Sequence, residues 1–150
     1  MLELEVTEGV VQTDQENLRI FEQLSQLGVV IAIDDFGSGY SSFASLKHLA
    51  AESLKIDKHF INDMVDDVKT KLLIESMIEI GHNLEHEITA EGVETQEQFD
   101  LLKAMGCETA QGFFISRPAA PEEIAKLLAA DDMTVEISGF RSARRRTSQL

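Results

Sequence analysis

Cysteine, basic residues and long apolar runs are all scarce in this 150-residue chain. Its one cysteine, Cys107, excludes an internal disulfide and fits a reducing compartment, so we expect a cytoplasmic protein in which Cys107 is a small buried residue. Only 13 Lys and Arg residues stand against 27 Asp and Glu residues, and the net charge of −14 argues against nucleic acid or an anionic lipid surface as a partner. No apolar run reaches the roughly 18 residues of a membrane span, and no charged-then-apolar leader opens the visible chain.

The residues needed for three common chemistries are also missing. His82 and His86 are four apart, but no third zinc ligand lies near them in the sequence, so we expect all four histidines to lie at the surface. The segment Gly37-Ser38-Gly39 lacks the following lysine that a nucleotide-binding P-loop requires. Ser41 and Ser42 have no convincing base for nucleophilic catalysis.

The chain does contain a run of five apolar residues that ends at two acids. Val29 to Ile33 is mostly β-branched and too short for a typical helix, which predicts a strand buried on both faces, as in a parallel sheet. Asp34 and Asp35 follow it directly, and glycines spaced for a mobile loop come next. In a strand-loop-helix unit this position is the carboxyl edge of the sheet, where ligands bind.

Strand and helix patterns alternate along the rest of the chain. We expect strands over residues 2–6, 29–33, 54–56, 88–90 and 112–115, and helices that begin near residues 13, 43, 68, 95 and 121. Two of the helices open with capping boxes, Thr13 with Glu16 and Thr95 with Gln98. The longest helix, over 68–84, is expected to turn inward Leu72, Leu73, Ser76, Met77 and Ile80. Five β-α repeats predict an α/β fold with parallel strands and right-handed crossovers.

Polar side chains stand at every expected strand end. In chain order they are Glu5 and Glu8, Asp34 and Asp35, Lys55 and Asp57, Glu91 and Glu94, and Gln111. Because the carboxyl ends of parallel strands lie on one edge of a sheet, we expect these side chains to converge. Carboxylates suit Mg²⁺, Mn²⁺ or Ca²⁺, and a lysine among them can hold a water or a phosphate oxygen.

A simpler interpretation treats these acids as helix N-caps or solvated loop residues. For one acid that interpretation is favoured by roughly three to one, because caps are common. Lys55 alone fits a surface residue, and Gln111 alone fits a partner of its own loop. Polar groups at all five strand ends shift the balance towards a functional site.

These strand ends resemble the motifs of the EAL domain family, bacterial phosphodiesterases that hydrolyse cyclic di-GMP (c-di-GMP) to the linear dinucleotide pGpG. The matching segments occur in the family's order: Leu4-Glu5-Val6-Thr7-Glu8, the segment from Ile33 to Ser42, Leu54-Lys55-Ile56-Asp57, the segment from Ala90 to Thr95, and Gln111-Gly112-Phe113. They cover residues 2 to about 128, and five motifs in register make a chance similarity implausible.

The resemblance implies a role for each matched residue. Glu5 and Asp34 would be metal ligands, and Asp35 would bind the second metal and orient the attacking water. Lys55 would contact that water or the scissile phosphate. Glu91 would be a ligand or a base beside the metals.

Two further residues complete the implied site. Gln111 would close the pocket, and Glu8 would stabilise the loop from Phe36 to Ser42, which in the family is linked to metal binding and to dimer contacts. The implied cofactors are two Mg²⁺ or Mn²⁺ ions. They would neutralise the phosphodiester, lower the pKa of a bridging water and stabilise the leaving oxygen.

The sequence also departs from the family's pattern. Ser38 stands where threonine is usual, and Lys58-His59 where arginine-serine is common. The Glu-Ala-Leu segment that names the family is absent, as are a nearby substrate-binding arginine and an asparagine ligand. We therefore expect a partial TIM-like (β/α) barrel, made of the last five β-α units, over residues 1–130. Residues 131–150 are expected to form a disordered tail whose basic end contains Arg141, Arg144, Arg145 and Arg146.

The functional expectation follows from this partial match. The chain is interpreted as the C-terminal part of a c-di-GMP phosphodiesterase, with c-di-GMP as ligand and a homodimer as a candidate assembly. With metal ligands missing, the isolated chain is expected to show little or no hydrolysis. Its exposed apolar sheet edge predicts that the chain is unstable, self-associates or is completed by further sequence. The alternatives are a degenerate EAL module that binds c-di-GMP or a protein partner without catalysis, and a fragment with no independent role.

Overall fold

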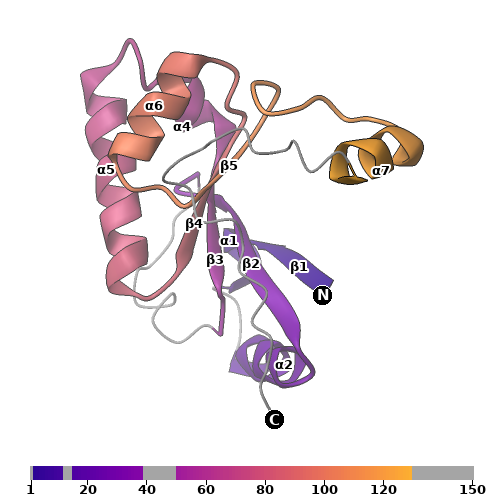
Figure 1. Cartoon of the computed structure of the whole chain (residues 1–150). Coiled ribbons are helices and arrows are strands. Elements are labelled where there is room, and N and C mark those ends of the chain that lie inside the picture. The colour runs from indigo at the N-terminus through magenta and orange to yellow at the C-terminus, as the bar shows by residue number, and fades with distance from the viewer. Residues whose placement is uncertain (1, 12–14, 39–49, 130–150) are drawn as a thin grey trace.

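The sheet predicted from the β-α repeats is confirmed in the computed structural model, which describes residues 2–11, 15–38 and 50–129. Its five parallel strands lie in the order of the chain: β1 (Leu2–Thr7), β2 (Val29–Phe36), β3 (Ser53–Ile56), β4 (Glu87–Glu91) and β5 (Thr109–Gln111) (Figure 1). The helices are α1 (Glu8–Val11), α2 (Gln15–Gln26), α4 (Lys58–Asp63), α5 (Val68–Asn83), α6 (Gln96–Ala104) and α7 (Pro121–Ala129). The expected helix near residue 43, His48, the capping residue Thr13 and the expected tail lie outside the described residues.

The sheet has one apolar face and one polar face because side chains alternate along each strand. The apolar face forms the core, with Ile31, Ile33, Leu54 and Ile56 fully buried, and α2 and α5 contact its strands. In Figure 1, α4, α5 and α6 gather on one side of β3 and β4. The register pairs Thr7 with Asp34, Ala32 with Ser53, Lys55 with Thr89, and Glu91 with Gln111. One candidate side chain from each strand therefore lies on the polar face: Glu5, Asp34, Lys55, Glu91 and Gln111.

The face of α5 that meets the core differs from the prediction. Of the five residues expected to point inward, only Met77 is buried; Leu72 and Leu73 are 55% and 44% exposed, Ser76 is exposed and Ile80 is half-buried. The buried residues are Ile74, Met77, Ile78 and Gly81. A Cβ at Gly81 would overlap the side chain of Ile88. This close approach to β4 fixes the rotation of the helix, and sequence periodicity alone did not reveal it.

The expected strand over residues 112–115 is wrong. The strand ends at Gln111, and the chain then turns: the Phe114 N–H donates to the Val93 carbonyl at 3.0 Å, and the Ile115 N–H donates to the Gly112 carbonyl at 3.0 Å. Phe114 packs against Phe99, with ring centroids 5.5 Å apart. Phe114 and Ile115 are apolar because they pack against the core, not because they belong to a strand, and Phe113 is 52% exposed.

The start and the end of α6 match the prediction. Thr95 and Gln98 form the expected capping box, in which each side chain accepts a backbone N–H at the other residue. Gly106, with φ of +84°, follows the helix as expected. The Gln98 amide also donates to the Ile61 carbonyl at 3.0 Å, which ties α6 to α4.

His86 is buried, so the expectation that all four histidines lie at the surface is wrong. It precedes β4, is only 7% exposed, and its Nδ1 lies 2.9 Å from the Ala51 carbonyl. Because a carbonyl can only accept, Nδ1 carries the proton and Nε2 does not. Within the described residues Nε2 is buried without a hydrogen-bond partner. Burial lowers the pKa of His86, and the hydrogen bond to Ala51 opposes this only in part.

This buried imidazole is expected to make the protein less stable in mild acid. The lowered pKa means that the unfolded chain binds the proton more readily, so the free energy of unfolding falls as pH drops below about 6.5, by at most about 1.4 kcal/mol per pH unit. Urea unfolding at pH 7.5 and pH 5.5 measures the loss. His86→Asn should reduce the difference between the two pH values, whereas substitution of the exposed His59 by glutamine should not. Equal pH dependence in both variants would contradict the assignment.

Candidate functional site

Lys55 is the centre of the polar face at the carboxyl edge. Its Nζ lies 2.5 Å from Glu5 Oε1, 2.5 Å from Glu91 Oε1 and 3.9 Å from Asp34 Oδ1. These four side chains come from β1, β2, β3 and β4, so residues up to 86 positions apart in the sequence meet at one place. Glu5 is about half exposed, and Asp34 and Glu91 are about one-quarter exposed.

The ammonium group of Lys55 is charged although the residue is only 5% exposed. Burial alone would lower the pKa of Lys55, but the hydrogen bonds to Glu5 and Glu91, together with their negative charges, outweigh burial and raise it. The fully buried Leu54 and Ile56 on either side anchor the strand in the core. The fold thus holds a fixed positive charge at the point where the acids converge.

An irregularity in β2 brings both adjacent acids to this edge. Neighbouring strand residues normally point to opposite faces, but the register with β3 shifts between Ile33 and Phe36, and Asp35 has φ of +55°. The Asp35 N–H donates to Asp34 Oδ1 at 2.9 Å, and the Ser38 N–H donates to the Asp35 carbonyl at 3.1 Å. The strand extends to Phe36, three residues beyond its predicted end, and the bulge redirects Asp35.

The Asp35 carboxyl is hydrogen-bonded to Asp57, which follows β3. This bond, then burial and the charges of Asp34, Asp57 and Glu91, raise the pKa of Asp35. Burial would raise the pKa of Asp57 too, but hydrogen bonds from the backbone and ring of His59 and from Asp35 outweigh it and lower the pKa. Asp35 therefore binds a proton more readily than Asp57 does, and the negative charge crowded at this edge contributes to the difference.

Sequence reasoning noted Asp57 at a strand end but gave it no role, and it did not consider His59 as part of the site. The structure connects both to Asp35: Asp57 Oδ1 accepts the His59 N–H at 2.7 Å and lies 2.6 Å from His59 Nδ1. Asp57 also caps α4. The position of Asp57 directly after Lys55-Ile56 was the sequence feature that could have identified it as a site residue.

The other two predicted site residues lie at the margins of the cluster. Glu8 is buried, and its Oε2 accepts the Gly37 N–H at 3.2 Å, which joins α1 to the turn that follows β2. Gln111 is the last residue of β5 and pairs in register with Glu91, with an exposed side chain. The structure thus brings Glu5, Asp34 and Glu91 within 4 Å of Lys55. Asp35 lies within range of the charges of Asp34 and Glu91, Glu8 holds the turn after β2, and Gln111 pairs with Glu91.

The donor chemistry of this edge fits a hard divalent cation. The carboxyl groups of Glu5, Asp34 and Glu91 lie around one ammonium. The charges of Asp34, Asp57 and Glu91 add to the hydrogen bond and the burial that raise the pKa of Asp35, and a further cation would relieve this crowding of negative charge. As they stand, no three acid, histidine or cysteine side chains among the described residues converge closely enough to hold a metal ion. Lys55 instead lies between two of the acids.

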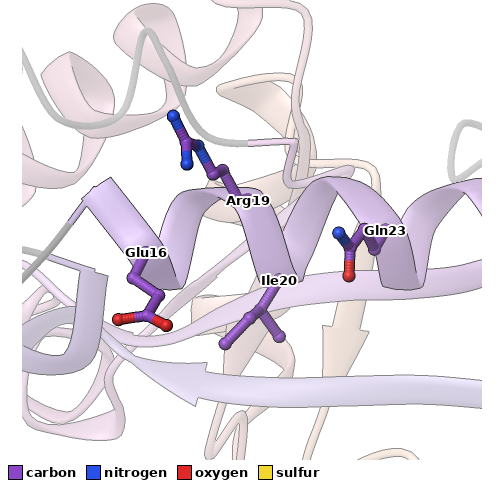
Figure 2. Close-up of a pocket in the computed structure, with 4 residues that line it drawn as sticks. All are labelled: Glu16, Arg19, Ile20 and Gln23. Atoms are coloured by element: carbon purple, nitrogen blue, oxygen red, sulfur yellow. The ribbon is translucent and has the colours of Figure 1, made fainter.

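A surface hollow of about 510 Å³ lies elsewhere, along α2. It is lined by Glu16, Arg19, Ile20 and Gln23. Figure 2 shows Arg19 on the side of the helix opposite to Glu16 and Ile20, so the polar groups do not converge. None of these residues belongs to the carboxyl-edge cluster, which remains the candidate site.

Motif order and strand-end geometry agree with a direct family comparison, in which the EAL domain model matches residues 1–118. The chain belongs to the EAL domain family. The predicted family and the α/β fold with a TIM-like relationship are both confirmed.

Two relatives illustrate the similarity. The chain is 44% identical over 127 residues to MucR of Pseudomonas aeruginosa, a bifunctional diguanylate cyclase and cyclic di-GMP phosphodiesterase, covering 84% of this chain and 18% of MucR. A solved MucR phosphodiesterase structure in complex with c-di-GMP matches 82% of this chain and 50% of that chain, with 45% identity and a TM-score of 0.78. BlrP1 of Klebsiella pneumoniae, solved as a manganese and c-di-GMP complex, is 30% identical, with a TM-score of 0.71 over 78% of this chain and 30% of that chain.

The chain therefore spans less than one-fifth of the length of MucR and half of its solved phosphodiesterase chain. Within the described residues, no helix is both long and apolar enough to cross a membrane.

Proposed function

We propose that this chain supplies part of the active site of a phosphodiesterase that hydrolyses c-di-GMP to pGpG in bacterial signalling. The observation that carries the proposal is the meeting of Glu5, Asp34 and Glu91 around the buried Lys55. Each of these residues lies in a segment that matches an EAL motif, and the solved relative MucR is a phosphodiesterase in complex with c-di-GMP.

Glu5, Asp34, Asp35 and Glu91 would hold two Mg²⁺ or Mn²⁺ ions. Their carboxylate oxygens are the ligand type that both ions prefer. When bound, the ions would neutralise the phosphodiester and lower the pKa of a water molecule. The manganese complex of BlrP1 supports this cofactor class.

The chain's own side chains would position the reactants. Lys55 presents a fixed positive charge that can hold a phosphate oxygen or the attacking water. Asp35, beside the charges of Asp34 and Glu91, would orient that water. Glu91, which contacts Lys55, would be a ligand or a base beside the metals. Gln111 would close the pocket, and Glu8 would hold the Phe36–Ser42 loop through the Gly37 N–H.

A module that binds c-di-GMP or a protein partner without catalysis is the second candidate. One observation favours it: among the described residues no three acids lie close enough together to hold a metal ion, and Lys55 forms close ion pairs with two of them. A homodimer and a cytoplasmic location remain proposals.

The test is a chimera in which residues 1–118 of this chain replace the matching segment of the MucR phosphodiesterase. The chimera should hydrolyse c-di-GMP with Mg²⁺ or Mn²⁺ within about tenfold of the MucR rate, because the two chains share a fold and 45% sequence identity. The isolated chain should show little or no turnover. A folded chimera that binds c-di-GMP but does not cleave it would favour the second candidate.

A further inference from the structure

Lys55 shares its charge between two acids that the proposed function assigns to metal binding. Its Nζ lies 2.5 Å from an oxygen of Glu5 and 2.5 Å from an oxygen of Glu91. Asp34 Oδ1, from a third assigned ligand, is 3.9 Å away. An ammonium group has three N–H donors and no acceptor, so these oxygens are directed at a cation that the chain itself provides.

We propose that Lys55 is an internal counter-ion that competes with a divalent cation for Glu5 and Glu91, so that metal binding requires its head group to leave at least one of them. The inference rests on the proposed function only for the identity of the ligands. The lone pairs of Glu5 Oε1 and Glu91 Oε1 that accept from the ammonium are not available to a metal ion, and the two cations would repel each other. The lack of a three-ligand cluster in the described part of the chain agrees with this competition.

Burial restricts which part of Lys55 can move away from its acid partners. The residue is 5% exposed, and its neighbours Leu54 and Ile56 are fully buried, so the backbone of β3 stays in place. Only the head group can move. It can keep one of its two close acid partners, Glu5 or Glu91, while it leaves the other. Breaking the ion pair of Lys55 with Glu5 or Glu91 therefore moves the ammonium charge within the site and leaves the strands in place.

The experiment compares the whole chain with Lys55→Met by calorimetric titration with Mn²⁺ and by thermal melting. In chelator, K55M should melt at a lower temperature, because its acids have lost their counter-ion. With Mn²⁺ its melting temperature should rise more than that of the unmodified chain, and its affinity for Mn²⁺ should be at least tenfold higher. Lys69→Met, which removes the same charge from an exposed position on α5, should bind Mn²⁺ like the unmodified chain.

Mn²⁺ binding by K55M that is no tighter than that of the unmodified chain, including no binding by either, would overturn the inference. If K55M fails to fold, a Mg²⁺ titration of the unmodified chain followed by NMR tests the inference. Mg²⁺ should shift the side-chain signal of Lys55. Metal binding that leaves that signal unchanged would overturn the inference. Neither readout uses c-di-GMP. A failed competition is thus distinguishable from a failure of the proposed phosphodiesterase activity, which the MucR chimera tests.

Discussion

Replacing Gly112 by alanine is expected to lower the free energy of unfolding by about 3 kcal/mol. A Cβ at this position would overlap the backbone N and O of Val93 and lie 2.7 Å from its carbonyl carbon. Neither side can easily move, because the Val93 N–H donates to the Gln111 carbonyl at 3.0 Å and the Val93 carbonyl accepts the Phe114 N–H at 3.0 Å. The clash is therefore between two stretches of backbone that are already hydrogen-bonded together.

Urea unfolding of G112A beside Gly9→Ala measures this effect. Gly9 has no heavy atom within 4 Å of an added Cβ, so its substitution should change stability by less than about 0.5 kcal/mol. Because Gly112 follows Gln111 and opposes the loop after Glu91, the substitution should disturb the structure at the carboxyl edge of the sheet. A loss below about 1 kcal/mol in G112A would show that the two segments separate more easily than the structure indicates.

Glu91→Gln, introduced into the MucR chimera, is expected to reduce c-di-GMP turnover at least about 100-fold. Glu91 is the acid that both contacts Lys55 at 2.5 Å and lies within charge range of Asp35. The substitution removes a charge that would help to hold a metal ion and leaves Lys55 with Glu5 as its close partner. Substitution of residues that merely support metal ligands costs 10- to 100-fold, so loss of a ligand should cost more.

Glu94→Gln is the matched control for this variant. Glu94 is exposed in the same β4–α6 connection, and its recorded hydrogen bond uses its backbone N–H, which donates to Gln98 Oε1 at 2.9 Å. Steady-state turnover of E94Q should stay within about twofold of the chimera. If the E91Q chimera kept more than half of the turnover of the chimera that carries Glu91, Glu91 would not be part of the active site.

The parallel sheet and the meeting of its polar ends were predictable from the sequence because both follow from β-α alternation. Parallel strands place Glu5, Asp34, Lys55 and Glu91 on one edge wherever the intervening helices lie. The order of the motifs along the chain also predicted membership of the EAL domain family. The roles of Glu8 and Gln111 remain predictions, as do those of the assigned metal ligands.

The remaining features depend on contacts between distant segments. Helix α5 has two apolar faces, either of which could have packed against the core. The close approach of Gly81 to Ile88 determines which one does. Nothing local in Asp34-Asp35-Phe36 signals the positive φ of Asp35 or its bond to Asp57, since β3 must first pair with β2. The burial of His86 likewise depends on its bond to Ala51, 35 residues earlier.

If this chain's carboxyl-edge side chains form a metal-dependent phosphodiester site, the MucR chimera must cleave c-di-GMP only when a metal ion is present. Product analysis of the chimera incubated with c-di-GMP, with Mn²⁺ or with chelator, measures this. We predict pGpG as the product with Mn²⁺ and no product with chelator. A folded chimera that releases no pGpG with Mn²⁺, or that releases it equally with chelator, would contradict the claim.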